Sequence, residues 1–335
     1  QFGRQSTTMA EMFMGGMMNE NEVLRTTGRD AIAKFLRQKT VYDVMRQSGK
    51  VVVFDTNIPI QLAFYALLEH DMPAAPLWDS VSRQFVGLMS VTDFIDILRH
   101  YHRRGIAMDD LSARTIGEVM SDVDGRRLQH FTFQGTAVDN DVFASIEILK
   151  QNNHRFLPII PPNESRVLSI MSYYDVLHYL VEQFREQRKL FEDSIFDLGI
   201  GTYGEDCLTV ATTATLAEVL DILERADVGA IPVVDENGRV IDLYSRSDIT
   251  FLATATDAQS VINNLGISIK ELLAARHAEV DIKDRLHTCS VRASLQSVFE
   301  LFSEIGFRRL VAVDEISGRC MGVITARDLI LYFCQ

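Results

Sequence analysis

The sequence has few cysteines, and those it has are poorly arranged for metal binding. Its 335 residues include four cysteines, with no CxxC pair and no spacing that suits zinc. We therefore expect no structural metal. Cys207, Cys289, Cys320 and Cys334 are predicted to be free thiols in a reducing compartment.

Positive charge is also in short supply. The chain has 33 Lys and Arg against 46 Asp and Glu, which gives a formal net charge of −13. Proteins that bind nucleic acid or anionic membrane surfaces concentrate Lys and Arg on one face. The net negative charge therefore argues against a nucleic-acid partner. It still allows local basic pockets.

Long apolar runs and catalytic motifs are missing as well. No segment approaches the roughly 18 consecutive apolar residues of a membrane span, and no charged-then-apolar start resembles a signal peptide. We expect no membrane insertion and a cytoplasmic or nuclear location. The chain has no G-x-S-x-G, no glycine-rich P-loop and no nucleophile with an evident base, so an enzyme is the least favoured interpretation.

One pattern, in contrast, is present four times. An apolar run, a turn and a second apolar run are followed by Ser or Thr and, three residues later, by Asp. The spacing from Pro76, Pro158, Pro232 or the equivalent Val311 to that Asp is 17, 17, 16 and 17 residues. Such regular spacing predicts a tandem array of four units. The pairs are Ser90 and Asp93, Ser172 and Asp175, Ser245 and Asp248, and Thr325 and Asp328.

Hydrophobic periodicity predicts an α/β fold of β-α-β-β-α units. The first unit, for example, predicts strands at 75–78 and 85–89 and a helix over 92–102. The length suffices for two domains with two units each. The predicted divisions are a flexible N-terminal tail (1–38), a first repeat (39–104), a linker with the second repeat (105–190), a third repeat (191–258) and a fourth (259–335).

Each Ser or Thr falls where a strand ends and a helix starts, which allows two interpretations. In the structural one, the pair is a capping box that satisfies free amides at the helix N-terminus. In the functional one, the same N-terminus accepts a phosphate while the carboxylate binds two ribose hydroxyls. Four copies on one scaffold favour a nucleotide site.

The repeats resemble CBS (cystathionine-β-synthase-type) repeats, and four of them together resemble the gamma regulatory subunits of AMP-activated protein kinase. The likeness runs from about residue 36 to the end. The stretches that carry it are VVFDT (52–56), AAPLWDS (74–80), FVG (85–87), TDFI (92–95), His154-Arg155, GTY (201–203) and PVVD (232–235).

This resemblance implies a regulatory protein without catalytic activity. In that family, two repeats pair head to tail into a module, and two modules form a flat disk that binds AMP, ADP or ATP toward its centre. The implied partners are a kinase alpha subunit and a beta subunit in a heterotrimer. Four aspartates are implied at ribose, Asp175 less securely: Asp93, Asp248, Asp328 and Asp175.

The resemblance also implies two further sets of ligand contacts. The phosphate-binding set is His154, Arg155, Arg246, Arg276, Arg308 and Arg309. The remaining contacts are Ser90, Thr202, Gly229, Ala230, Ser245 and Thr325.

Several positions depart from the family pattern. Arg308 replaces a His, His178 replaces a Lys, and Pro73, Tyr174 and Asp227 replace Arg or Lys. Asp227 matters most, because a like charge about 5 Å from a phosphate at an effective dielectric of about 20 costs roughly 3 kcal/mol. The chain is therefore either a nucleotide-sensing subunit or a scaffold that assembles with the kinase but has weakened or lost sensing.

Overall fold

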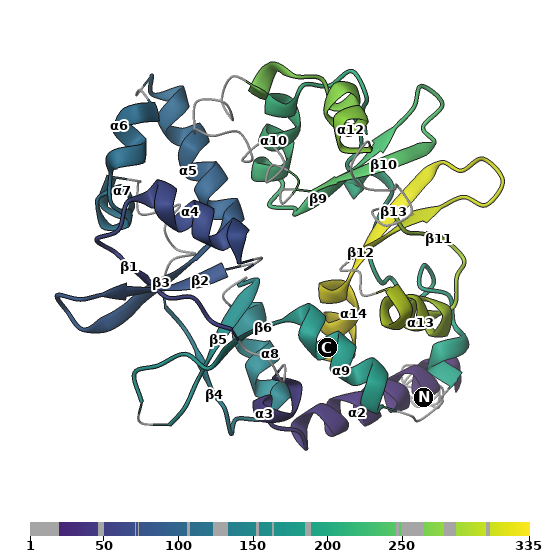
Figure 1. The fold of residues 1–335 in the computed structure, drawn as a ribbon. Helices are drawn as coiled ribbons and strands as arrows, with labels where there is room; N and C mark the ends of the chain where they lie inside the picture. The colour runs from purple at the N-terminus through teal and green to yellow at the C-terminus, as the bar shows by residue number, and fades with distance from the viewer. Residues whose placement is uncertain are drawn as a thin grey trace, which may run out of the picture.

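The computed structural model describes residues 20–45, 50–70, 72, 74–105, 108–122, 133–151, 154–162, 164–184, 189–245, 248, 264–277, 286–305 and 309–335. Four small sheets, each with its own helices, surround a common centre (Figure 1). The α/β fold class and the four repeated units predicted from the sequence are confirmed.

Each repeat builds its sheet in the same way. The first strand pairs in parallel with the second, and the second pairs antiparallel with the third. A helix connects the first two strands, as a parallel connection requires.

The bounds of these elements follow chain order. Repeat 1 has β1 (Phe54–Asp55), α4 (Ile60–Glu69), β2 (Ala74–Asp79), β3 (Gln84–Ser90) and α5 (Val91–Arg103). Repeat 2 has β4 (Thr136–Ala137), α8 (Val142–Gln151), β5 (Phe156–Ile160), β6 (Ser169–Ser172) and α9 (Tyr173–Gln183). Repeat 3 has β8 (Val210–Ala211), α10 (Leu216–Arg225), β9 (Ala230–Val234) and β10 (Val240–Ser245). Repeat 4 has β11 (Thr288–Ser290), α13 (Leu295–Ile305), β12 (Arg309–Val313), β13 (Cys320–Thr325) and α14 (Ala326–Phe333).

Two hydrophobic cores join repeats that are not neighbours in sequence. One core combines buried side chains of repeats 1 and 3, and the other combines those of repeats 2 and 4. The hairpins make different connections. Phe85 of repeat 1 stacks on Phe133 just before β4, and Val240 of repeat 3 donates its N–H to the carbonyl of Gly318 in repeat 4 at 3.1 Å. Helices and hairpins together close the four repeats into a ring.

A buried ion pair joins repeats 1 and 3. Arg99 on α5 is 6% exposed, and its guanidinium donates to the carbonyl of Leu220 at 2.9 Å and to Glu224 at 2.8 Å on α10. It also contacts Asp221. A buried charge is tolerated when it is paired and hydrogen-bonded, so this contact fixes how the two helices pack.

The predicted repeat boundaries differ from the packing, because four connecting segments cross over. They are α3 (Val41–Val44), which packs on repeat 2, α6 and α7 (Met108–Ala113 and Ile116–Asp122) on repeat 1, η2 with β7 (Lys189–Glu192 and Thr202–Tyr203) on repeat 4, and η5 with α12 (Asn264–Gly266 and Ile269–His277) on repeat 3. Backbone hydrogen bonds hold them there: Val41 to Asn140, Ile116 to Ile58, Leu295 to Asp193, and Ile269 to Ala214. The boundaries predicted from the sequence instead place α3 in the first repeat, α6 and α7 with the second, β7 in the third, and η5 and α12 in the fourth.

The tail prediction also changes. Residues 20–37, expected to be flexible, form helix α2 (Glu20–Arg37), whose Ile32 and Leu36 are completely buried. Their i, i+4 spacing places both on one face, which packs against α8 and α14. Residues 1–19 lie outside the described part of the chain.

Candidate functional site

The repeated Ser or Thr and Asp pairs form capping boxes at the strand-to-helix junctions. In each pair the carboxylate accepts the backbone N–H and the hydroxyl of the Ser or Thr three residues earlier. The two distances are 2.7 and 2.6 Å for Ser90 and Asp93, 2.8 and 2.6 Å for Ser172 and Asp175, 2.9 and 2.8 Å for Ser245 and Asp248, and 2.8 and 2.7 Å for Thr325 and Asp328. The structural interpretation of the pattern is therefore realised in repeats 1, 2 and 4, while in repeat 3 the residues around Asp248 lie outside the described part of the chain.

The boxes of the repeats nevertheless differ from other capping boxes in this chain. Similar pairs occur at Thr40 and Asp43, Thr115 and Glu118, Thr215 and Glu218, and Ser268 and Glu271. Those four acidic residues are exposed, whereas Asp175 and Asp248 are buried and Asp93 and Asp328 are half-buried. Helix capping alone does not require a carboxylate to leave water, so the burial favours a second role.

Two of the aspartates keep one oxygen available. In Asp93 and Asp328, both bonds from the capping residue go to Oδ2. Within the described residues, Oδ1 of each accepts no hydrogen bond. Since a carboxylate has about four acceptor positions, capping a helix and accepting a ligand hydroxyl are compatible.

Strand register places the start of the middle strand beside each box. The residue opposite the capping Ser or Thr is Ala74 in repeat 1, Phe156 in repeat 2, Ala230 in repeat 3 and Arg309 in repeat 4. Arg155 and Gly229 directly precede two of these positions. The repeats therefore present the residues at 155, 229 and 309 in related places next to a capping box.

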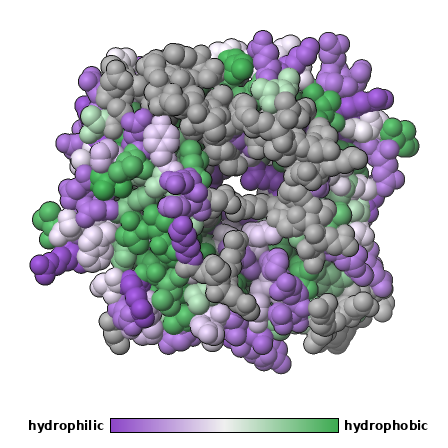
Figure 2. Space-filling model, in the orientation of Figure 1, coloured by the Kyte–Doolittle hydropathy of each residue, from purple (hydrophilic) through white to green (hydrophobic). Residues whose placement is uncertain are grey.

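These strand starts converge from three repeats. Arg155 of repeat 2 donates from Nη2 to Asp227 Oδ1 of repeat 3 at 2.8 Å. A β-carbon built at Gly229 would lie 3.7 Å from Nη2 of Arg309 in repeat 4, so the guanidinium passes close to the glycine. We call Arg155, Asp227, Gly229 and Arg309 the central cluster. On the face seen in Figure 2, the surface is hollowed at its centre, and hydrophilic residues are visible inside the hollow.

Asp227 has an unusual backbone as well as a central position. It follows the end of α10 in the left-handed conformation, with φ of 50°. Asp tolerates this conformation better than most residues do. The side chains of Arg155 and Asp227 are 40% and 49% exposed, so water screens the ion pair and the contact contributes little to stability. Arg155 can therefore exchange this partner for another anion at small cost.

The predicted contact Thr202 lies at the other side of the fourth repeat's box. Thr202 on β7 pairs with Val323 on β13, two residues before Thr325. The approach is close, because a β-carbon at Gly322 would lie 2.6 Å from the Thr202 carbonyl oxygen. Tyr203 is nearby, and burial, with smaller contributions from Cys289 and Asp328, raises the pKa of its hydroxyl.

The structure says less about the other predicted residues. His154 is half-buried directly before Arg155, and its backbone N–H donates to Leu149 at the end of α8. Arg246, Arg308 and Pro73 lie outside the described residues, as does the side chain of Arg276 on α12. Ser90 and Asp93 of repeat 1 share no hydrogen bond with the central cluster among the described residues. The substituted Tyr174 and His178 approach each other on α9, with ring centroids 6.2 Å apart.

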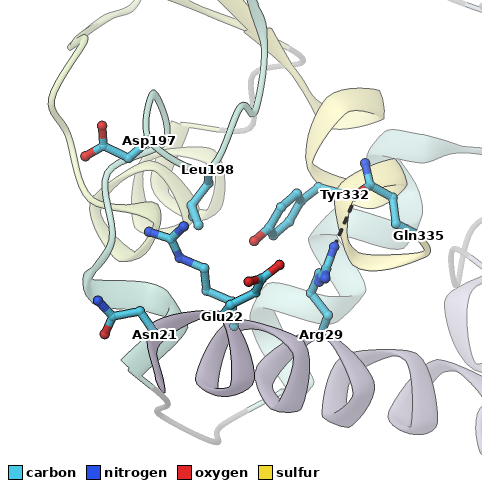
Figure 3. A pocket seen from close by; sticks show the side chains of 8 residues that line it. Asn21, Glu22, Arg29, Asp197, Leu198, Tyr332 and Gln335 are labelled. Carbon is cyan, nitrogen blue, oxygen red and sulfur yellow. Dashed lines mark hydrogen bonds between the residues drawn. The ribbon is translucent and has the colours of Figure 1, made fainter. Parts of the chain in front are cut away.

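A separate pocket lies away from this cluster, between α2 and the end of α14 (Figure 3). Its volume is about 380 Å³, and Arg29 on its wall donates to the side chain of Gln335 at 3.2 Å. Arg25, also on the wall, is paired with Asp193 at 2.8 Å. Arg25 is thus already paired with a carboxylate, as Arg155 is in the central cluster.

Two other kinds of feature are absent from the described residues. No three His, Cys, Asp or Glu side chains in that part of the chain are grouped so that they could hold a metal ion. None of its helices combines the length and apolar character needed to cross a membrane.

Comparison with known proteins finds CBS domains in the second half of the chain. The CBS domain model matches residues 202–253 and 278–334. Human 5'-AMP-activated protein kinase subunit gamma-3 is 32% identical over 316 residues, which cover 92% of this chain and 62% of the relative. The gamma subunit of Dictyostelium discoideum is 28% identical over 322 residues, covering 94% of this chain and 54% of the relative. The chain thus spans about six-tenths of the length of these curated relatives.

A solved structure supports the fold. A protein of Methanocaldococcus jannaschii, suggested to be an archaeal homologue of g-AMPK, superposes with a TM-score of 0.67 at 19% identity. The match covers 88% of this chain and all of the archaeal one. At this identity the likeness concerns the fold alone.

Proposed function

Because this chain is a divergent member of the CBS-domain family that includes the gamma subunits of AMP-activated protein kinase, we propose that it is a regulatory subunit that senses adenine nucleotides. Its ligands are AMP, ADP and ATP, bound near the centre of the ring. It has no catalytic role of its own. Binding alters a kinase only to the extent that the nucleotide has different affinities for the active and inactive states of the assembly.

The convergence of strand starts from three repeats is the observation that carries this proposal. Arg155 comes from repeat 2 and Arg309 from repeat 4, and Gly229 keeps the space beside Arg309 free of a side chain. An arginine offers a planar pair of donors that matches phosphate geometry. A phosphate between the two arginines would be held from repeats 2 and 4 at once.

The capping boxes supply the second half of the ligand site. Asp328 lies beyond Thr325, which is opposite Arg309 in the hairpin, and Asp248 lies beyond Ser245, which is opposite Ala230. We propose that Asp328 binds ribose through its available oxygen while Arg309 binds phosphate. Asp248 and Asp93 take the equivalent role in their repeats, and Asp175 is the least secure of the four.

The proposed partners are a kinase alpha subunit and a beta subunit, and the proposed location is cytoplasmic or nuclear. The partners are proposed from the similarity to gamma subunits, and the location from the lack of a long apolar run or signal-peptide pattern in the sequence. No metal is needed to hold the nucleotide, because its phosphates are met by arginines.

A scaffold that assembles with the kinase but no longer senses nucleotides is the second candidate. The Asp227 carboxylate favours it, because an acidic side chain lies where a phosphate would approach. The two functions differ in one respect. In a scaffold, Asp248→Ala and Asp328→Ala leave kinase regulation unchanged while assembly persists.

Calorimetric titration of the chain assembled with its kinase subunits tests the proposal. We expect AMP and ATP to bind, and Asp328→Ala to weaken binding by about tenfold or more, since bonds to a charged group contribute roughly 1.5 to 3 kcal/mol. Asp43→Ala is the matched control, because it removes an equivalent but exposed capping-box carboxylate. Absence of binding at millimolar nucleotide would rule sensing out.

A further inference from the structure

Two of the four cysteines face each other across repeats 3 and 4. The Sγ atoms of Cys207 and Cys320 are 3.8 Å apart, although 113 residues separate them in sequence. Both are partly exposed, whereas Cys289 and Cys334 are buried. The close pair is therefore also the pair that a small solute in water can reach.

We propose that Cys207 and Cys320 form an oxidation site at which hydrogen peroxide converts the two thiols into a reversible disulfide. Neither cysteine is among the residues proposed to contact the nucleotide, although β7 and β13 also carry Thr202 and Thr325.

The chemistry balances with peroxide as the only co-reactant. The Cys207 thiolate attacks one peroxide oxygen, the O–O bond breaks, and hydroxide leaves, which gives a sulfenic acid at Cys207. The Cys320 sulfur then attacks the Cys207 sulfur, the S–O bond breaks, and its thiol proton leaves with the oxygen as water. Overall, two thiols and one peroxide give one disulfide and two waters, so the sulfur pair loses the two electrons that peroxide gains.

The order of attack follows from the contact between the thiols. A hydrogen bond from Cys320 lowers the pKa of the Cys207 thiol, because it stabilises the thiolate. The same contact and burial raise the pKa of Cys320. Cys207 is thus the nucleophile, and Cys320 is the resolving thiol.

The backbone around the pair makes bond formation feasible. A disulfide has an S–S distance of about 2.05 Å, so the sulfurs must move together by under 2 Å, which side-chain rotation can supply. Cys207 follows η3 (Gly204–Asp206) at the end of the segment that begins with β7. β7 is already hydrogen-bonded to β13, the strand that begins with Cys320.

The link would fasten two repeats together. The Cys320 backbone N–H donates to the Gly238 carbonyl in the turn of repeat 3 at 3.1 Å. A disulfide to Cys207 would hold β7 and its Thr202 on β13 covalently. A bond that closes so long a loop restricts the unfolded chain and should stabilise this half of the ring.

A metal site is the competing interpretation of two adjacent cysteines. Tetrahedral zinc needs four ligands, and three in a catalytic site. Cys207 and Cys320 have no third His, Cys, Asp or Glu grouped with them among the described residues. Oxidation is therefore the chemistry that this pair supports.

The test is peroxide treatment of the full chain, followed by blocking of free thiols and peptide mass spectrometry without reduction. We expect a linked peptide that contains Cys207 and Cys320, while Cys289 and Cys334 remain reduced as internal controls. Dithiothreitol should reverse the link, and Cys207→Ser and Cys320→Ser should each abolish it. The oxidised chain should melt roughly 5 °C higher than the reduced chain, a rise that Cys207→Ser removes.

Three results would overturn the proposal. One is oxidation of Cys207 to a sulfinic acid without a linked peptide. Another is a link that joins two chains or includes Cys289 or Cys334. The third is a linked peptide that forms equally in Cys207→Ser, which would place the reactive pair elsewhere.

Discussion

Arg155 of repeat 2 and Asp227 of repeat 3 form an ion pair, with Nη2 of the arginine 2.8 Å from Oδ1 of the aspartate. The sequence presents Asp227 only as a negative charge that opposes phosphate binding. The structure adds its partner, which makes the two side chains together neutral. A phosphate that approaches Arg155 must therefore displace a carboxylate.

The first prediction concerns this displacement. Asp227→Asn should raise nucleotide affinity about fivefold to tenfold, because it removes the competing charge while screening by water limits the gain. Asn also tolerates the left-handed backbone at this position. Glu236→Gln is the matched control, since it removes one exposed negative charge from the turn of the same repeat. Equal affinities of Asp227→Asn and wild type in a calorimetric titration would contradict competition by Asp227.

The second prediction concerns the close approach of β7 to β13. Gly322→Ala should displace β7, because the new β-carbon would lie 2.6 Å from the Thr202 carbonyl oxygen. We expect a lower melting temperature and weaker nucleotide binding. Gly266→Ala serves as the control, since a β-carbon there would meet nothing within 4 Å. Unchanged melting of Gly322→Ala would mean that β7 packs differently.

The third prediction concerns the contact between repeats 1 and 3. Arg99→Ala should lower the free energy of unfolding by about 3 kcal/mol, because it leaves Glu224 without its buried partner. Arg103→Ala removes an exposed arginine that also contacts Asp221 and Glu224, and should lower the free energy of unfolding by under about 1 kcal/mol. Urea unfolding of both variants measures the difference. Similar losses in the two would show that burial of Arg99 is unimportant.

The fourth prediction concerns alkaline pH. Burial raises the pKa of the Cys289 thiol to about 12. The unfolded thiol, with a pKa of about 8.5, loses its proton first. The stability that this thiol contributes is therefore fully present below pH of about 8.5 and is lost as the pH rises toward 12. At pH 10 the loss from this thiol is about 2 kcal/mol.

Urea unfolding between pH 7.5 and pH 10 tests this dependence. The decline should be shallower in Cys289→Ala than in wild type. A decline that is equally steep in Cys289→Ala would exclude the buried thiol as its source.

Local features of the fold could be predicted from the sequence. The strand expected at 75–78 lies within β2, and the helix expected over 92–102 lies within α5, because apolar spacing reports which face of an element is buried. The Ser or Thr and Asp pairs could also be predicted, because a capping box involves residues only three positions apart. Helix α2 was missed because its buried face follows a Met- and Gly-rich segment that obscures the period.

Long-range relationships could not be predicted in this way. Arg155 and Asp227 are 72 residues apart, and Cys207 and Cys320 are 113 apart. Neither pair has a sequence signal, since each depends on how whole repeats are placed around the ring. The connecting segments that pack on another repeat were assigned wrongly for the same reason. A local period shows that a helix has an apolar face, but not which repeat covers that face.

A crystal structure of the chain grown with AMP would test nucleotide binding at the centre of the ring most directly. We predict ribose density at Asp328 and a phosphate within hydrogen-bond distance of Arg309, with the Arg155 and Asp227 side chains moved apart. AMP bound solely in the outer pocket beside Arg29, or no AMP at millimolar concentration, would contradict it.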